Sequence, residues 1–323
     1  MCGVHSHDHH MTLTILGGDA RQISVCAALT DAGHHLRVLG LGETEGEHSS
    51  RPREVLSLPG VKLCCDLSRA LEGCDGVVLP YPATKDGSTV YSPLDTQHII
   101  TLEDIGVYAQ KHPGLWIFGG RMPDSWAESL RHSGCRVVDY ENYESFLIKN
   151  ARLTTEGAIM TAMELTDTAL LNAPVAVIGY GRIGQLLADL LSAMHARVTV
   201  FARREESLSL AEARGCDGVS TSQLARLADG YGIIFNTVPE RLMSKSLLAM
   251  MPCDTLIIDL ASAPGGLDPE GAREATRRCG LQVIKAPSLP GRYAPRDAGR
   301  AIAEVILSAL RAWEQREGGG KNL

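Results

Sequence analysis

The chain has 323 residues, which exceeds the usual size of one domain, so two domains are expected. Its composition, 44% hydrophobic but only 5% aromatic, is typical of parallel sheets covered by helices. A net charge of −7 without a basic stripe argues against nucleic-acid binding, and no apolar run reaches the roughly 20 residues that span a bilayer. Because the N-terminus also lacks the apolar core of a signal peptide, we expect a cytoplasmic protein.

The first ten residues contain Cys2 and a cluster of histidines at positions 5, 7, 9 and 10. A disordered leader is favoured over a metal site there, because nothing apolar would fix the geometry of the ligands. The nine cysteines include no Cys-x-x-Cys spacing, so no structural zinc site is expected. We therefore predict a disordered leader over residues 1–10 and no metal.

Through the first half of the chain, short apolar runs alternate with amphipathic helical stretches, a pattern typical of βαβ units. The expected strands are 13–16, 36–39, 76–79, 115–118 and 136–138, with helices near 20–32, 68–71, 101–111 and 125–131. This pattern predicts that residues 11–152 form a doubly wound, Rossmann-like domain of their own, which we expect to bind the substrate.

A longer helix is predicted over 155–171, because apolar side chains recur there on one face. Pro174 should end this helix, since proline cannot continue one, and the domain join is placed at or just before its start. After it, strands are expected at 175–178, 198–201, 232–235, 255–259 and 282–286, with a closing helix over 300–316.

The predicted fold class is therefore α/β, with two doubly wound Rossmann-like domains, parallel sheets and a cleft between them. Residues 153–297 would form the second domain. The C-terminal helix, 298–316, is expected to pack back on the first domain.

The segment Gly179-Tyr180-Gly181-Arg182-Ile183-Gly184 matches the Gly-x-Gly-x-x-Gly fingerprint of dinucleotide-binding folds. Its context fits, because an apolar strand precedes it and a leucine-rich helix follows it. In such a turn Gly179 permits the tight bend, Gly181 lets a pyrophosphate reach the backbone, and Gly184 lets helix and strand pack closely. The N–H groups at the start of the helix, at Arg182 and Ile183, are predicted to bind the phosphates. The alternative is a tight turn without a ligand.

The end of the next predicted strand distinguishes between the two nicotinamide cofactors. NAD-specific folds place an acidic residue there to hold the ribose 2′-OH. This chain instead has Arg203 and Arg204, whose guanidinium groups suit a 2′-phosphate. Glu205 and Glu206 lie a few residues beyond the position at which an acidic residue would bind the ribose 2′-OH. The sequence therefore favours NADP, and the alternative is that both arginines belong to a solvated turn.

Three later strand ends should line the nicotinamide side of the site, since ligands bind beyond the carboxyl ends of parallel strands. Each is rich in Pro, Gly or small residues that let a flat ring approach. Any one of them could equally be an ordinary loop that binds no ligand, because Pro and Gly also mark simple turns. The candidate cofactor-binding residues are Asn236, Thr237, Val238, Pro239, Asp259, Leu260, Ala261, Ser262, Pro287, Leu289 and Pro290.

In the first domain, Asp19 and Arg21 lie at the mouth of a strand–helix turn. Asp19 either caps the helix or takes part in catalysis, and Arg21 would be a natural clamp for a carboxylate in the cleft. Glu156, near the start of the predicted long helix, is either a helix-dipole partner or an acid in the cleft. These three residues are the candidate catalytic groups.

Taken together, these segments resemble the A-subunit family of dipicolinate synthase. The motifs that carry the resemblance are 17–22, 155–160, 179–184, 259–262 with 264–266, and 289–291 with 294–295, in order along nearly the whole chain after Met11. The sequence departs from the family pattern at Ser288, where glycine is more frequent, and at Arg296, where lysine is usual. These departures concern contacts near the expected nicotinamide side.

The resemblance implies an oxidoreductase of a spore-forming bacterium, acting in the mother cell at a branch of the lysine pathway. It implies that dihydrodipicolinate, formed from 4-hydroxy-tetrahydrodipicolinate, is oxidised to dipicolinate with NADP+ during sporulation. It also implies that the partner is a smaller, flavoprotein-like B subunit, and a homo-oligomer is expected. Two substrate carboxylates need cations, for which Arg21, Lys85, Arg121 and Arg292 are available.

Two other functions fit part of the pattern. A D-2-hydroxyacid-dehydrogenase-like enzyme shares the two-domain plan, but it relies on a histidine after the last Rossmann strands, and residues 286–299 contain none. A non-catalytic NADP-binding regulator would keep the glycine turn without needing a substrate clamp. The arginine and aspartate of the first domain count against both.

Overall fold

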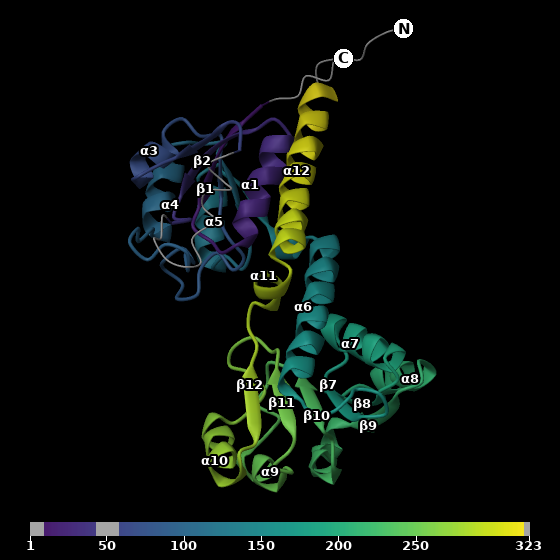
Figure 1. Ribbon diagram of the computed structural model, residues 1–323. Coiled ribbons are helices and arrows are strands. Elements are labelled where there is room, and N and C mark those ends of the chain that lie inside the picture. The colour runs from purple at the N-terminus through teal and green to yellow at the C-terminus, as the bar shows by residue number, and fades with distance from the viewer. Residues whose placement is uncertain (1–9, 43–57, 320–323) are drawn as a thin grey trace. The chain divides into compact units, whose positions relative to one another are not determined.

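The computed structural model describes residues 10–42 and 58–319 (Figure 1). Two compact units divide the chain: unit 1 comprises Met1–Lys149 with Ala294–Leu323, and unit 2 comprises Asn150–Tyr293. Helix α6 (Glu144–Leu165) crosses from one to the other. The predicted leader lies outside the described residues apart from His10. In the described ranges no helix is long and apolar enough to cross a membrane.

Unit 1 contains a six-stranded parallel sheet with the strand order β3-β2-β1-β4-β5-β6. Its strands are β1 (Thr12–Leu16), β2 (His35–Leu39), β3 (Val61–Leu63), β4 (Gly76–Val78), β5 (Trp116–Gly119) and β6 (Arg136–Asp139). Its helices are α1 (Arg21–Asp31), α3 (Leu67–Leu71), α4 (Leu102–Gln110), α5 (Asp124–His132) and α12 (Pro295–Gly319), with the 3-10 turn η1 (Tyr140–Asn142). Helices α1 and α12 cover one face of the sheet, and α3, α4 and α5 cover the other.

Unit 2 repeats this plan with the order β12-β11-β10-β7-β8-β9, also all parallel. Its strands are β7 (Pro174–Ile178), β8 (Arg197–Ala202), β9 (Asp217–Ser220), β10 (Ile233–Asn236), β11 (Leu256–Asp259) and β12 (Gln282–Lys285). Its helices are α7 (Arg182–Ala193), α8 (Glu205–Ala213), α9 (Lys245–Met250), α10 (Pro269–Cys279) and α11 (Leu289–Tyr293), with the 3-10 segment η2 (Thr221–Asp229). The α/β class with two Rossmann-like parallel sheets is thus confirmed.

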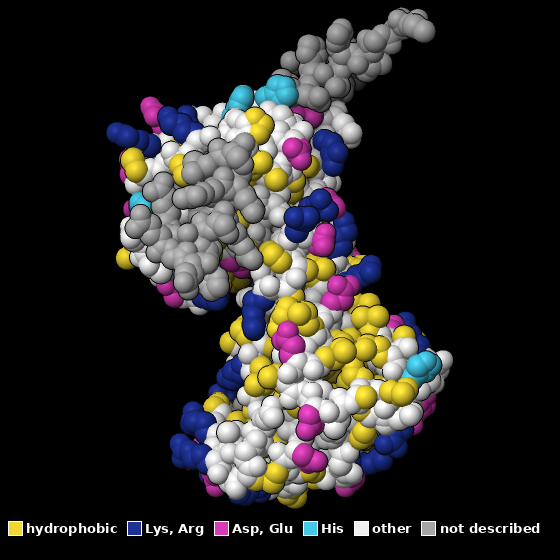
Figure 2. Space-filling model, viewed as in Figure 1, with side chains coloured by type: hydrophobic (Ala, Val, Ile, Leu, Met, Phe, Trp, Pro, Cys, Tyr) yellow, Lys and Arg dark blue, Asp and Glu magenta, His cyan; other side chains and the backbone are white. Residues whose placement is uncertain are grey.

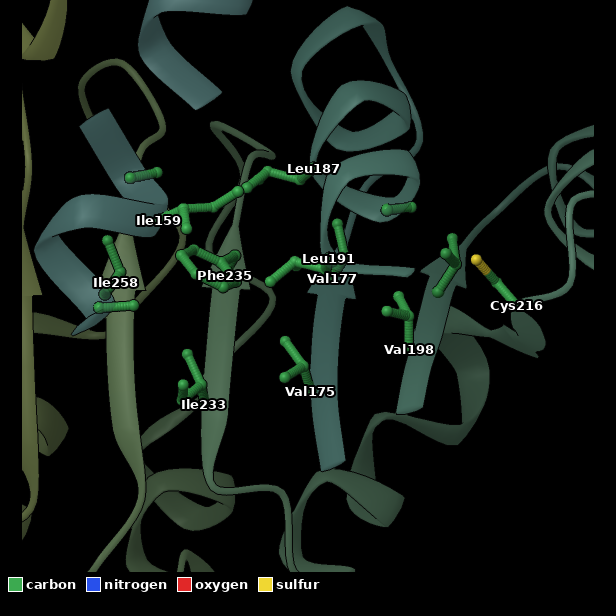
Figure 3. Packing of buried hydrophobic residues seen from close by; sticks show 14 of the residues in the cluster. Ile159, Val175, Val177, Leu187, Leu191, Val198, Cys216, Ile233, Phe235 and Ile258 are labelled. Atoms are coloured by element: carbon green, nitrogen blue, oxygen red, sulfur yellow. The ribbon is translucent and has the colours of Figure 1, made fainter. Parts of the chain in front are cut away.

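The core of unit 2 shows why these strands are continuous apolar runs. Ile159 of α6 and Leu187 and Leu191 of α7 lie over the strands, where they pack on Val177 and Phe235 (Figure 3). A second cluster covers the opposite face of the same sheet. Burial on both faces removes the polar alternation that a half-exposed strand would have.

The prediction for the long helix was wrong at both ends, because α6 begins at Glu144 and ends at Leu165. Thr154 and Thr155 are buried inside it, and their hydroxyls donate to the carbonyls of Asn150 and Ala151 at 2.7 and 3.0 Å. Such back-bonding lets threonine sit within a helix instead of capping it. Pro174 is the first residue of β7, a position where a strand tolerates proline.

Two strands were not predicted from the sequence. Strand β3 has three residues and β9 has four, and both lie at sheet edges. Neither carries a run of large apolar side chains, because an edge strand is only partly covered.

Candidate dinucleotide site and the turns of the two units

The turn between β7 and α7 has the three features that a dinucleotide turn needs. Gly179 has φ +95°, which favours glycine, and a Cβ there would clash with Thr237. A Cβ on Gly184 would clash with the carbonyl oxygen of Gly179, so helix and strand approach too closely for any side chain. By contrast, a Cβ on Gly181 would meet no described atom within 4 Å. The turn is tightly packed at Gly179 and Gly184 and open at Gly181, which is the arrangement that a pyrophosphate-binding turn needs.

Helix α7 starts directly at this open position. Gly181 is its N-cap, and no described side chain caps the helix through a hydrogen bond. The first turn, with Arg182 and Ile183, carries no acidic residue. Backbone N–H groups and the positive end of the helix dipole are therefore directed towards the space beside Gly181, which suits an anion.

The end of β8 places two arginines beside this turn in the parallel sheet. The strand ends at Ala202, Arg203 and Arg204 are exposed, and Arg204 is the N-cap of α8. In the described part of the chain neither arginine makes an ion pair. Glu205 and Glu206 belong to the first turn of α8, where carboxylates favour the helix N-terminus.

Asn236 and Asp259, at the carboxyl ends of β10 and β11, hold the neighbouring loops together. The amide Nδ2 of Asn236 donates to Asp259 Oδ1 at 2.7 Å and to the Val238 carbonyl at 3.0 Å. Asp259 also accepts from the backbone N–H groups of Ala261 at 3.3 Å and Gly266 at 3.2 Å. Both side chains are buried. They are positioned to shape the loops that would face a cofactor, and their predicted direct contact with it stays a prediction.

The other candidates at these strand ends differ in exposure. Pro239, Ser262 and Pro287 are exposed, and Thr237, Val238, Leu260 and Ala261 are half-buried. Thr237 lies beneath the glycine turn, where its hydroxyl donates to the Ile178 carbonyl at 2.9 Å. Leu289 and Pro290 are buried at the start of α11, and Leu289 packs on Gly157 of α6. Packing accounts for the last two without a ligand.

Unit 1 has a turn at the same point of its fold, between β1 and α1, but this turn is covered. The Gly18 N–H donates to the Tyr91 carbonyl at 2.8 Å, and a Cβ on Gly17 would meet Val90, Tyr91 and Ser92. The Ser92 hydroxyl donates to the Gly40 carbonyl at 2.6 Å, which ties the covering segment to the end of β2. The segment after β4 thus occupies the place where a phosphate would bind.

Arg21 and Asp19 form a bidentate ion pair at this covered turn. Arg21 Nε and Nη2 each lie 2.8 Å from an oxygen of Asp19, and Nη2 also donates to the Tyr81 carbonyl. The Arg21 side chain is only 4% exposed. Asp19 further accepts from the Arg21 backbone N–H at 3.1 Å, although the N-cap of α1 is Ala20. Because Asp19 occupies both Nε and Nη2 of Arg21, a substrate carboxylate that bound these two atoms would have to replace Asp19.

Glu156 lies in the middle of α6 and not near its start, so the predicted role as a helix-dipole partner is wrong. Its Oε1 is 3.2 Å from Arg152 Nε, one turn earlier, in a half-exposed ion pair. The assignment of Glu156 as a catalytic acid stays a prediction.

The remaining candidate cations have partners of different kinds. Lys85 Nζ lies 3.9 Å from the centre of the Tyr91 ring, and Arg292 packs over Tyr293. Arg121 Nε lies 3.1 Å from Glu141 Oε1. Of these, Lys85 lines a cavity of about 340 Å³ formed by the segment that covers the unit 1 turn.

Sequence reasoning missed two residues of this same cavity. His98 Nδ1 lies 2.8 Å from Asp95 Oδ2, and Asp95 is buried. Burial raises the pKa of the Asp95 carboxyl, but hydrogen bonds from the His98 ring and from the backbone outweigh it and lower the pKa overall. The signal was an Asp-x-x-His spacing in a loop. In the described ranges no group of three or more metal-binding side chains is present.

Comparison with known proteins follows the division into two units. The family described as the N-terminal domain of the dipicolinate synthase A subunit matches residues 12–141, and the NAD-binding domain of D-isomer-specific 2-hydroxyacid dehydrogenases matches residues 141–265. The dipicolinate synthase A subunit of Bacillus subtilis is 27% identical over 309 residues, which cover 95% of this chain and 98% of that protein. The resemblance to the dipicolinate synthase A subunit is confirmed.

Solved structures agree with this resemblance. The dipicolinate synthase A chain of Bacillus subtilis is 28% identical, with a TM-score of 0.76 over 95% of this chain and 97% of that one. The corresponding protein from Bacillus halodurans is 27% identical, with the same TM-score over 93% and 97%. D-lactate dehydrogenase from Escherichia coli, at 15% identity and a TM-score of 0.60 over 96% and 98%, shares the fold. The chain is an oxidoreductase of the dehydrogenase type, and unit 2 contains its nicotinamide-dinucleotide domain.

Proposed function

We propose that the chain is the A subunit of a dipicolinate synthase that oxidises dihydrodipicolinate to dipicolinate with NADP+. The observation that carries this proposal is that similarity to the dipicolinate synthase A subunit runs through both units. A nucleotide domain alone would fit many dehydrogenases, whereas the match to residues 12–141 is specific to this family.

Within this proposal the residues of unit 2 bind and orient the cofactor. The N–H groups at the start of α7, beside the open Gly181, hold the pyrophosphate. Arg203 and Arg204, exposed at the end of β8, hold the 2′-phosphate and favour NADP over NAD. Asn236 and Asp259 keep the loops after β10 and β11 in place. When bound, the oxidised nicotinamide supplies a hydride acceptor.

The substrate loses one hydride and one proton, and the ring that remains is an aromatic pyridine dicarboxylate. Aromatisation favours hydride loss, so a strong base is not required. We propose that unit 1 supplies the groups for the two carboxylates, with Arg21 released from Asp19 and with Lys85 as a second cation. Asp19 and Glu156 are proposed to assist proton removal or loss of water.

The partner and the setting of this activity are also proposals. Because the relatives are named as one component of a synthase, we propose that a B subunit is the partner. Activity in the mother cell of a sporulating bacterium follows from the same resemblance. The match of residues 141–265 to D-2-hydroxyacid dehydrogenases favours, as the second candidate, an enzyme that acts on a 2-hydroxy acid.

The test is an assay of NADPH formation with freshly prepared hydroxy-tetrahydrodipicolinate, with and without the B subunit, and with NAD+ in a parallel series. We expect dipicolinate and NADPH to form together in equal amounts. Turnover of D-lactate instead would support the second candidate. Cofactor binding without turnover of any substrate would indicate a regulator and exclude the synthase proposal.

A further inference from the structure

Two cavities of the described chain differ in the ligands that they suit. The cavity between α6 and α7 of unit 2, about 450 Å³ in volume, is lined by apolar side chains and two glutamates, and its described lining includes no lysine, arginine or histidine. Figure 2 shows hydrophobic side chains gathered over these two helices. The cavity of unit 1, about 340 Å³ in volume, is instead lined in part by Lys85, Asp95 and His98. Of these two cavities, the one in unit 1 therefore suits an anionic ligand.

The unit 1 cavity lies in the segment after β4, at the carboxyl ends of the parallel strands. Two of its lining residues, Tyr91 and Ser92, contact the turns that follow β1 and β2. The Tyr91 carbonyl accepts from the Gly18 N–H at 2.8 Å, and the Ser92 hydroxyl donates to the Gly40 carbonyl at 2.6 Å. The strand order reverses between β1 and β4, which is where open parallel sheets bind their ligands. The position of the cavity is thus that of a ligand site.

Within this cavity His98 is held in one orientation by Asp95. Asp95 Oδ2 lies 2.8 Å from His98 Nδ1, and Oδ1 accepts from the backbone N–H groups of Gln97 at 2.9 Å and His98 at 3.1 Å. Burial raises the pKa of the Asp95 carboxyl, but these hydrogen bonds lower it overall, so the group is ionised. An ionised carboxylate only accepts hydrogen bonds. In the neutral ring, Nδ1 of His98 therefore carries the proton and Nε2 carries the lone pair.

Two groups of the cavity are available to a ligand. In the described part of the chain Nε2 of His98 has no hydrogen-bond partner, and the His98 side chain is 40% exposed. Lys85 lies over the Tyr91 ring and makes no ion pair with any described residue. By contrast, Asp19 and Glu156 are each paired with an arginine. His98 is therefore better prepared than either carboxylate to accept a proton directly.

We propose that His98 accepts the proton released when dihydrodipicolinate is oxidised, with Asp95 as its positioning residue. This inference rests on the proposed function. One ring carbon gives up a hydride to NADP+, and the neighbouring carbon loses its proton to Nε2 of His98, so that the electron pair of the second C–H bond completes the aromatic ring. The Asp95 carboxylate stabilises the imidazolium that forms. Lys85 holds a carboxylate of the substrate, and Ile99 and Ile100, which also line the cavity, suit the faces of its ring.

The test is the rate of NADPH formation in a single turnover of the full-length chain, with the B subunit and freshly prepared substrate. His98→Gln should slow this step about 100-fold, the contribution of a general base, and should change the dissociation constant of dipicolinate less than about 3-fold. Imidazole added to His98→Ala should raise the rate about 10-fold, because a free base then replaces the missing ring. His132→Gln is the matched control and should keep the full rate. His132 is an exposed histidine at the end of α5 in unit 1, its Nδ1 lies 2.8 Å from the Glu128 carbonyl oxygen, and it is not among the described lining residues.

Two further variants separate positioning from binding. Asp95→Asn keeps an acceptor for the backbone N–H groups but turns an N–H towards His98, so kcat should fall about 10-fold or more with KM unchanged. Lys85→Met should instead raise KM about 10-fold and should not respond to imidazole.

The outcomes distinguish this inference from the proposed function. A wild type that does not oxidise the substrate would overturn both. An active wild type whose rate is unaffected by His98→Gln would overturn this inference alone. A slow His98→Ala variant with a lowered Tm, whose rate imidazole does not restore, would also overturn it, because His98 would then only hold the loop in place.

Discussion

Units 1 and 2 have the same strand order, yet their first strand–helix turns are built for different purposes. Read from the edge strand, unit 1 runs β3-β2-β1-β4-β5-β6 and unit 2 runs β9-β8-β7-β10-β11-β12. In unit 2 the turn is open at Gly181. In unit 1 the segment around Tyr91 lies across the turn, and the Arg21–Asp19 pair fills the start of the helix. The comparison shows that strand order alone does not make a dinucleotide site.

The two units differ in the segment that follows their fourth strand, β4 in unit 1 and β10 in unit 2. After β4 of unit 1, residues 80–100 make a long loop that returns to the first turn and bonds to Gly18. After β10 of unit 2, the segment bonds to the base of the turn at Ile178 through Thr237 and leaves Gly181 clear. Each of the following predictions alters a residue in or beside one of these two turns and measures protein stability, cofactor binding or both.

The largest effect is expected at Gly184. Gly184→Val should destabilise the protein by about 3 kcal/mol or more and abolish measurable NADPH binding, because the side chain would overlap the Gly179 carbonyl. Thermal unfolding and fluorescence titration with NADPH measure both. Gly232→Ala is the control, since a Cβ at Gly232 meets no described atom within 4 Å and its φ is not positive. A stable Gly184→Val protein that binds NADPH normally would contradict the tight turn.

Breaking the ion pair of unit 1 should come next. Arg21→Met leaves the Asp19 carboxylate, which is only 15% exposed, without its partner and should cost about 2 to 3 kcal/mol of stability. NADPH affinity should not change, because the cofactor domain is unit 2. The double variant Arg21→Met, Asp19→Leu should recover part of the loss. If Arg21→Met left the stability intact but raised only the KM for the substrate, Arg21 would be a substrate clamp without a structural role.

Gly181→Val should have the opposite profile to Gly184→Val. The free protein should keep its Tm within about 2 °C, since the added side chain enters open space and φ at Gly181 is −83°. The NADPH dissociation constant should rise about 10- to 100-fold, because the pyrophosphate can no longer approach the backbone. Unchanged affinity would mean that the open side of the turn is not the phosphate site.

Arg203→Glu should have the smallest effect, which concerns the choice of cofactor. We expect NADP affinity to fall about 10-fold, the contribution of one charge-assisted hydrogen bond, with NAD affinity unchanged or improved. Arg226→Glu alters an exposed arginine of the same unit in η2 and serves as the control. Equal loss for both cofactors would show that Arg203 does not discriminate between them.

The parts of this architecture that sequence reasoning predicted are those governed by local pattern. The alternation of apolar strands and amphipathic helices predicted both sheets, because parallel strands are buried on both faces. The spacing of Gly179, Gly181 and Gly184 predicted the open turn, because each glycine has a separate steric task. The predicted start of the long helix at Thr155 was wrong. From the sequence alone, a threonine that caps a helix cannot be distinguished from one inside a helix whose hydroxyl donates to a carbonyl of the preceding turn.

Other features depend on contacts between distant residues and left no local pattern. The cover that Tyr91 places over Gly18 joins two loops of unit 1 that are far apart in the chain. The bond between Asn236 and Asp259 unites the ends of two neighbouring strands, so two predicted cofactor ligands proved to be partners of each other. Composition indicated neither contact, since both depend on register and loop path.

Unit 2 lies in the chain as an insertion, because unit 1 is resumed only at Ala294. Helix α12 packs closely on α1, where a Cβ on Gly299 would clash with the Arg21 carbonyl, and it covers one face of a sheet whose strands all precede residue 140. During synthesis, the strands of unit 1 therefore leave the ribosome before α12, and the face that α12 covers is fully buried only after α12 has been made. Unit 2, by contrast, is continuous in the chain and can fold as one segment. Emergence of α12 thus becomes the step that completes the domain made first.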